Sequence, residues 1–82
     1  MENIHNKISR SCPLCRQGMQ EILKELSSGT LYICCDECDL EWPNPEDALA
    51  DIHRSRDKYG RSVDATPEEI KAAGWNKYLI DY

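Results

Sequence analysis

Four of the five cysteines in this chain form two pairs with the same short spacing. Cys12 and Cys15 make the first C-x2-C pair, and Cys35 and Cys38 make the second. The segment between the pairs, residues 16–34, falls in the range of about 15 to 20 residues that separates the halves of such sites. Each pair can turn onto one cation, and two pairs supply the four soft sulfur ligands that tetrahedral zinc prefers. The spacing therefore predicts a four-thiolate Zn2+ site.

The fifth cysteine, Cys34, adjoins Cys35 and raises the question of which of the two binds the metal. Cys35 gives the C-x2-C spacing, whereas Cys34 would give the less common C-x3-C spacing, so we assign the ligand to Cys35. Cys34 is then expected to be a small core residue on a strand, or a redox-sensitive thiol if it is exposed. The histidines, His5 and His53, are not expected to bind the metal, because four cysteines already complete the site.

The residues around the cysteine pairs predict strands. Residues 19–26 and 30–34 are rich in apolar side chains, and the Ser-Ser-Gly turn between them indicates a hairpin that carries one cysteine pair at each end. Residues 39–42 predict a third short strand. A helix over 17–26 is an alternative by propensity, but the ribbon pattern favours a strand. The leader, residues 1–11, is expected to fray or to add a single edge strand.

Two helix starts follow the predicted strands. Asn44 as N-cap and Pro45 at the first helical position predict a helix that runs to about Arg54. Thr66, with a glutamate three residues later, forms a capping box for a second, short helix that ends at Gly74. Residues 55–65 between the helices predict a mobile basic loop, which suits a contact surface or is simply solvated. The apolar tail, residues 75–82, is expected to fold back onto the sheet or to face a partner.

These elements predict a small α+β fold. We expect a single domain, residues 1–82, in which a zinc ribbon of three antiparallel strands and two cysteine knuckles occupies residues 12–42. A helical extension, residues 44–82, would add one or two short helices. In so short a chain the core supplies only about 3 to 5 kcal/mol, so we expect the metal to contribute to folding.

The charge of the chain is negative and unevenly distributed. The formal net charge is −5, and a zinc ion held by four thiolates would bring it to about −7. Lys24 is the sole lysine or arginine in residues 17–53, whereas residues 54–61 are basic. An acidic face opposes DNA or RNA and favours a basic protein partner, although it also suits plain solvation. The acids expected to contact that partner are Asp36, Glu37, Asp39, Glu41, Glu46, Asp47 and Asp51.

The cysteine pattern resembles the zinc-ribbon proteins of bacteria and phages. The resemblance rests on the Cys-Pro-Leu-Cys motif at 12–15 and on Tyr-Ile-Cys-Cys-Asp-Glu-Cys at 32–38, and it covers residues 12–42. In that group a glycine usually follows each knuckle, and here Arg16 and Asp39 stand at those two positions. In size and charge the chain is also similar to bacterial toxin-immunity proteins, and its Cys-Pro start and later helix are similar to anti-restriction proteins.

Catalysis is not expected. Four cysteines leave no open coordination position on the metal, and neither His5 nor His53 is followed two residues later by an acid, as a zinc deaminase requires. There is no glycine-rich phosphate loop. A Cys-x-x-Cys redox enzyme would need a βαβ setting, and a rubredoxin-like iron carrier would need its typical glycines, so both alternatives are weaker.

The sequence thus favours a small, acidic, zinc-binding protein-interaction module. The most specific hypothesis is an immunity or inhibitor protein that neutralises a cognate basic toxin or nuclease. A nucleic-acid- or transcription-associated zinc ribbon and an anti-restriction protein are the alternatives. The cysteines, with no long apolar run beside them, favour a reducing cytoplasm without a membrane segment.

Overall fold

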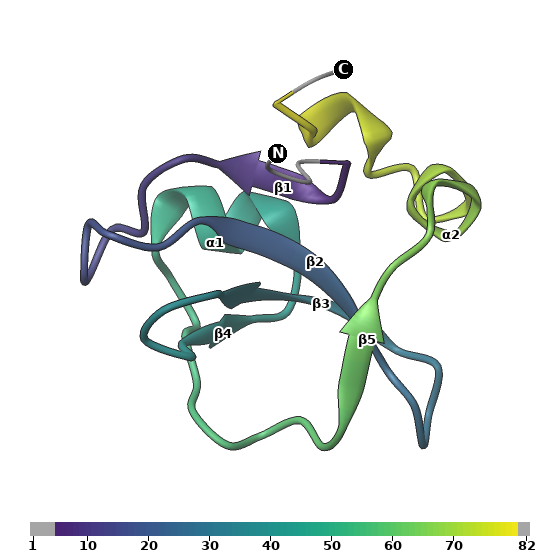
Figure 1. Ribbon diagram of the computed structural model, residues 1–82, viewed down its shortest axis with the longest axis horizontal. Coiled ribbons are helices and arrows are strands. Elements are labelled where there is room, and N and C mark those ends of the chain that lie inside the picture. Colours follow the sequence, from purple (N-terminus) through teal and green to yellow (C-terminus); the bar gives the residue numbers. More distant parts are fainter. Residues whose placement is uncertain (1–4, 81–82) are drawn as a thin grey trace.

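A computed structural model of the protein, which describes residues 5–80, contains an antiparallel sheet and two short helices (Figure 1). The strands are β1 (Lys7–Ser9), β2 (Gln20–Glu25), β3 (Leu31–Cys35), β4 (Glu41–Trp42) and β5 (Ser62–Asp64). The helical elements are α1 (Pro45–Ala50), α2 (Pro67–Ala72) and the 3-10 turn η1 (Asn76–Tyr78). The expected α+β architecture is therefore present, with more strands than the sequence indicated.

The β2–β3 hairpin forms the centre of the sheet. Its register pairs Ile22 with Ile33 and Gln20 with Cys35, so these side chains share one face. The strands run in the order β1-β2-β3-β4, and β5 pairs with β2 as well. Because β3 occupies one edge of β2, the strands β1 and β5 must follow one another along its other edge.

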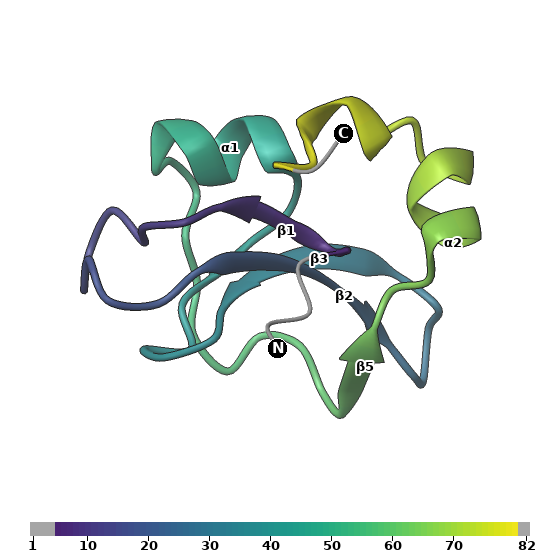
Figure 2. The ribbon, with the colours of Figure 1, turned by 45° about the horizontal axis from the view of Figure 1, so that its top comes forward.

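The helices cover one face of this sheet. Figure 2 shows α1, η1 and α2 on the same side, while the segment between α1 and β5 runs along the opposite side. The core lies beneath the helices and contains Ile22, Ile33, Trp42 and Ile70, all fully buried. The side chain of Gln20, also buried there, donates from Nε2 to the carbonyl of Ala48 at 2.9 Å. Sheet and helices therefore share one hydrophobic core.

Both predicted helix starts are confirmed by their capping bonds. The backbone N–H of Asp47 donates to Oδ1 of Asn44 at 2.8 Å, and Thr66 forms the complete capping box. Helix α1, however, ends at Ala50 rather than near Arg54. Asp51 adopts a left-handed conformation with φ 53° and ends the helix there, a conformation that aspartate tolerates better than most residues.

The sheet corrects the expectation of three strands. Strand β1 confirms the alternative expectation that the leader adds a single edge strand. β5 lies inside residues 55–65, which we expected to form only a mobile loop. Its sequence, Ser-Val-Asp, has no hydrophobic alternation, and its backbone pairing with β2 holds it. Part of the apolar tail folds back, because Trp75, Tyr78 and Leu79 pack against the core; Tyr82 lies outside the described residues.

Candidate metal centre

The structure brings the four predicted metal ligands together. The sulfur atoms of Cys12, Cys15, Cys35 and Cys38 all lie within 4.8 Å of one another. The Cys12–Cys38 pair is 3.7 Å apart and the Cys15–Cys35 pair is 3.6 Å apart. Four sulfurs at about 2.3 Å from a tetrahedral zinc would be about 3.8 Å from each other. The spacing of the sulfurs therefore fits a zinc ion at the centre of the cluster.

The two knuckles share one backbone pattern. In the first, the N–H of Arg16 donates to the carbonyl of Cys12 at 2.9 Å. In the second, the N–H of Asp39 donates to the carbonyl of Cys35 at 3.3 Å. Each of these turns closes around a cysteine pair, so that both sulfurs of the pair face the same point. The hairpin β2–β3 then sets the two turns opposite one another.

Arg16 and Asp39 occupy the two positions where zinc-ribbon knuckles usually have glycine, and their backbones adopt a conformation that favours glycine. Arg16 has φ 58° and Asp39 has φ 62°, both in the left-handed region. In this region a Cβ atom crowds the following carbonyl oxygen, at a cost of about 1 to 2 kcal/mol per residue. The departure from the ribbon pattern at these positions therefore leaves the turns intact and places strain beside the metal ligands.

Backbone N–H groups point at the cysteine sulfurs. The N–H of Leu14 lies 3.4 Å from Sγ of Cys12, and those of Glu37 and Cys38 each lie 3.4 Å from Sγ of Cys35. Such N–H groups stabilise negative charge on sulfur. The amides of residues 17 and 18 likewise lower the pKa of Cys15 to about 6. The first turn therefore favours the thiolate form of Cys15.

Burial opposes the negative charge of a thiolate at the second cysteine pair. It raises the pKa of Cys35 and of Cys38 above the usual value of a thiol. Four thiolates this close together repel one another, and a divalent cation bound between them removes both the repulsion and the cost of burial. The donor set therefore fits a soft divalent metal such as zinc, held by all four cysteines.

A contact between the knuckles involves residues that the sequence did not single out. The carbonyl of Gly18 accepts the N–H of Cys12 at 2.8 Å. Next to it, the N–H of Met19 donates to Oδ1 of Asp36 at 2.8 Å, and the N–H of Asp36 donates to the carbonyl of Met19 at 3.0 Å. Residues 18 and 19 thus join the first knuckle to the second. A single glycine directly after Gln17 gives no sequence signal for this role.

Cys34 lies outside the metal cluster. Its side chain points to the opposite face of β3 from that of Cys35. Its cross-strand partners are Glu21 on β2 and Glu41 on β4. Burial, followed by the nearby carboxylates, raises the pKa of its thiol to about 12. A thiol this hard to ionise is a poor nucleophile at neutral pH. The arrangement favours the packing role for Cys34 over the redox role.

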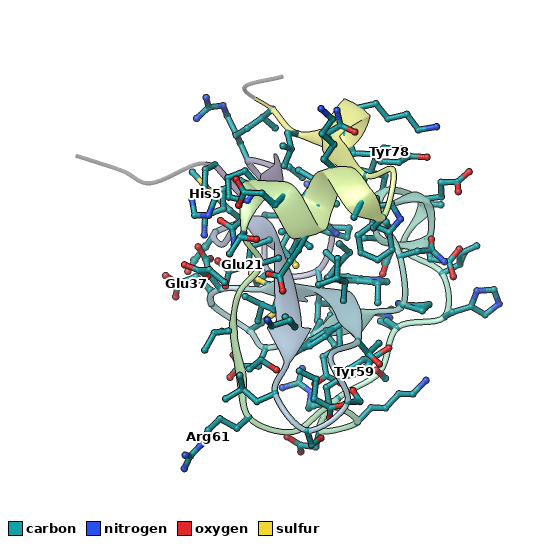
Figure 3. All side chains as sticks on the ribbon, turned by 90° about the vertical axis from the view of Figure 1, so that its right-hand side faces the viewer. His5, Glu21, Glu37, Tyr59, Arg61 and Tyr78 are labelled. Atoms are coloured by element: carbon teal, nitrogen blue, oxygen red, sulfur yellow. The ribbon has the colours of Figure 1, made fainter. Side chains whose placement is uncertain are left out.

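The expected partner-binding acids fall into two groups. Asp36, Glu37, Asp39 and Glu46 are exposed, and the first three lie on the turn of the second knuckle; Figure 3 shows Glu37 on the outside of the molecule. Asp36 is also 3.5 Å from Nζ of Lys7, which forms an ion pair with Glu21.

The remaining three acids, like Asp36, have partners within the protein. Asp47 accepts a hydrogen bond from Nδ1 of His53 at 2.9 Å, and Asp51 accepts one from Nε1 of Trp42 at 3.2 Å. Glu41 is only 6% exposed, and its carboxylate accepts hydrogen bonds from the segment that follows α1. Glu41 is therefore a structural residue rather than a contact residue, and the sequence alone did not distinguish it from its exposed neighbours.

Comparison with protein-family models, with curated proteins and with solved structures returned no match. The resemblance to zinc ribbons thus rests on the cysteine pattern and on the geometry of the cluster. Among residues 5–80, no helix is both long enough and apolar enough to cross a membrane.

Proposed function

We propose that the protein is a zinc-stabilised protein-interaction module without catalytic activity, whose acidic knuckle binds a basic protein. The observation that carries the proposal is the closed set of four cysteines directly beside exposed carboxylates on the second knuckle. A metal with four protein ligands has no position for substrate, so it serves the fold. A rigid turn that presents Asp36, Glu37 and Asp39 offers fixed negative charge to a cationic partner.

The most specific form of this proposal is an inhibitor of a basic toxin or nuclease, in the manner of an immunity protein. Enzymes that act on nucleic acids carry cationic clefts for phosphates, and an acidic inhibitor can occupy such a cleft. The net charge of −5 supports this proposal because it speeds association with a basic protein and disfavours nucleic acid as the direct partner. We place the module in a reducing compartment, where the thiolates stay available to zinc.

Two measurements test the proposal. Elemental analysis of the purified protein should find one zinc per chain. Affinity capture from the source cell should then recover a basic protein whose activity falls when the zinc-loaded protein is added. Glu37→Lys should abolish this recovery, whereas Glu68→Lys, an equal charge change at an exposed position on α2, should preserve it. Equal recovery with both variants, or recovery of nucleic acid instead of protein, would overturn the proposal.

A further inference from the structure

The segment that follows α1 is fixed to the sheet at its first half. We call residues 54–61 the basic loop; its cationic residues are Arg54, Arg56, Lys58 and Arg61. Ser55 and Glu41 exchange two backbone hydrogen bonds, of 2.9 and 2.8 Å. The buried carboxylate of Glu41 also accepts the hydroxyl of Ser55 at 3.0 Å and the N–H groups of Lys58 at 3.0 Å and Tyr59 at 3.4 Å. One buried acid thus holds several points of the loop.

The second half of the loop is fixed as well. The ring of Tyr59 stacks on that of Tyr32 in β3, with centroids 3.8 Å apart and planes 6° from parallel. The N–H of Gly60 donates to Oε2 of Glu25 at 2.6 Å, and the carbonyl of Arg61 accepts the N–H of Leu26 at 2.9 Å. The loop is therefore ordered before any partner arrives, which removes much of the entropy cost of binding.

This ordered loop presents its cations to solvent. All four cationic side chains belong to exposed residues, and Figure 3 shows that of Arg61 extending away from the ribbon. Among the described residues, Arg54 alone of these four lies near a carboxylate oxygen, at 3.8 Å from Asp51. Nζ of Lys58 lies 5.6 Å from the centroid of the Tyr59 ring, and the lysine remains exposed to solvent. The loop thus offers the guanidinium groups of Arg56 and Arg61 and the ammonium group of Lys58 for pairing with a partner.

Exposed apolar side chains lie at both ends of the loop. Leu49 and Ile52 precede it, and Leu26 and Val63 adjoin its end; each is about half exposed. Leu26 is hydrogen-bonded to Arg61 through the backbone. Val63 pairs with Lys24 on β2, so its side chain shares the helix-covered face of the sheet with Ile22. A cationic loop flanked by aliphatic groups matches a ligand that carries both negative charge and apolar side chains.

The local charge distinguishes between two kinds of anionic partner. Beneath and beside the loop lie the carboxylates of Glu25, Glu41, Asp51 and Asp57, which offset the loop's cations at longer range. A nucleic acid depends on a sustained positive field along its backbone, and that field is absent. Single carboxylates that pair with arginine at short range do not need it. The surroundings therefore favour protein carboxylates over a chain of phosphates.

We propose that the basic loop and its flanking aliphatic side chains bind an acidic segment of a partner protein that also carries apolar residues. This surface is separate from the acidic knuckle of the proposed function, so either proposal can fail without the other. Its occupant would pair carboxylates with Arg56, Lys58 and Arg61 and place an aliphatic group on Leu26.

The test uses the zinc-loaded full chain and a short fluorescein-labelled peptide of interspersed Glu and Leu residues. Fluorescence anisotropy should show saturable binding that weakens as salt is raised. The triple variant Arg56→Gln, Lys58→Gln, Arg61→Gln should bind about tenfold more weakly, as expected for three lost surface ion pairs. A control triple, Arg10→Gln, Lys71→Gln, Lys77→Gln, removes the same charge from other exposed positions and should bind like the parent.

A second pair of variants tests the apolar part of the proposed binding surface. Leu26→Ser should weaken peptide binding severalfold, whereas Leu14→Ser, at a similarly exposed site on the first knuckle, should not. Zinc content and thermal denaturation of every variant verify the fold. Absence of peptide binding, or an equal loss in the two triple variants, would overturn the proposal. Tighter binding of a labelled oligothymidylate that depends on the same arginines would overturn it too and assign the loop to nucleic acid.

Discussion

Gly18 lies so close to Cys35 that a Cβ atom on Gly18 would be 2.6 Å from the Cys35 sulfur. The same atom would be 2.7 Å from Oδ1 of Asp36 and 2.8 Å from Cβ of Glu37. Carbon atoms do not approach neighbours this closely without movement of the chain. The backbone of Gly18 is not among those with positive φ, so space rather than backbone conformation requires glycine here. The absence of one methyl group allows the second knuckle to meet the first.

Gly18→Ala is therefore expected to push the knuckles apart. Overpacking of this kind costs about 1 to 3 kcal/mol, and the displaced sulfur of Cys35 should weaken zinc binding about tenfold or more. Competition with a chromophoric chelator measures the zinc affinity, and thermal denaturation measures the stability. At Gly60, an added Cβ would meet only the flexible carboxylate of Glu25 at 3.4 Å, so Gly60→Ala is the matched control. Parent-like zinc affinity in Gly18→Ala would contradict the packing argument.

Substitution of Arg16 or Asp39 by glycine should instead stabilise the protein. Both residues have positive φ, so glycine should relieve their strain. After subtraction of the extra freedom that glycine gives the unfolded chain, Arg16→Gly should raise the free energy of unfolding by about 0.5 to 1 kcal/mol. Asp39→Gly should gain less, because aspartate tolerates this region better. Denaturant unfolding of the zinc-loaded protein measures both changes.

The control for these variants is Gln17→Gly, next to Arg16 but outside the residues with positive φ. It should destabilise the protein by about 0.5 to 1 kcal/mol, because glycine there relieves nothing. If all three glycine variants lower stability to the same extent, the knuckles do not carry the strain that we infer.

Replacement of Cys34 and replacement of the adjacent Cys35 should have very different effects on zinc binding and stability. Cys35→Ser removes a buried ligand, so it should abolish stoichiometric zinc binding and unfold much of the ribbon. Cys34→Ser leaves the four sulfurs in place and should cost about 1 kcal/mol or less, since the site is only half-buried. Zinc content by elemental analysis and the near-UV circular dichroism of each variant provide the readout. Loss of zinc from Cys34→Ser with zinc retained by Cys35→Ser would reverse the ligand assignment.

Local chemistry made the helix starts and the cysteine cluster predictable. Asn44 and Thr66 cap their helices through contacts within three residues, which a sequence displays directly. The cysteine spacing fixes each knuckle in the same local way. The hairpin register then follows from the turn between β2 and β3, which brings the two knuckles face to face.

The features that the sequence did not indicate depend on distant contacts. β5 is polar and short, and it exists because β2 has a free edge at Leu23–Glu25. Glu41 resembled the exposed acids around it, yet its neighbours in space are residues 55–59, which turn back over β4. Gly18 is needed because of the second knuckle, far along the chain. The partners in each of these contacts lie at least 14 residues apart along the chain, beyond the reach of local patterns.

The dependence of the basic loop on Glu41 gives the final prediction. Glu41→Gln keeps the size of the side chain but replaces one acceptor oxygen with a donor, so one of the groups that it binds, the Ser55 hydroxyl or the N–H of Lys58 or Tyr59, loses its partner. An unsatisfied group of this kind costs about 1 to 3 kcal/mol. Amide hydrogen exchange at Lys58 and Tyr59 should therefore accelerate about tenfold, while exchange in the core of β2 and β3 stays slow. Glu37→Gln, the same change at an exposed position, should leave these amides unaffected; equal acceleration in both variants would mean that charge alone, rather than the buried carboxylate, orders the loop.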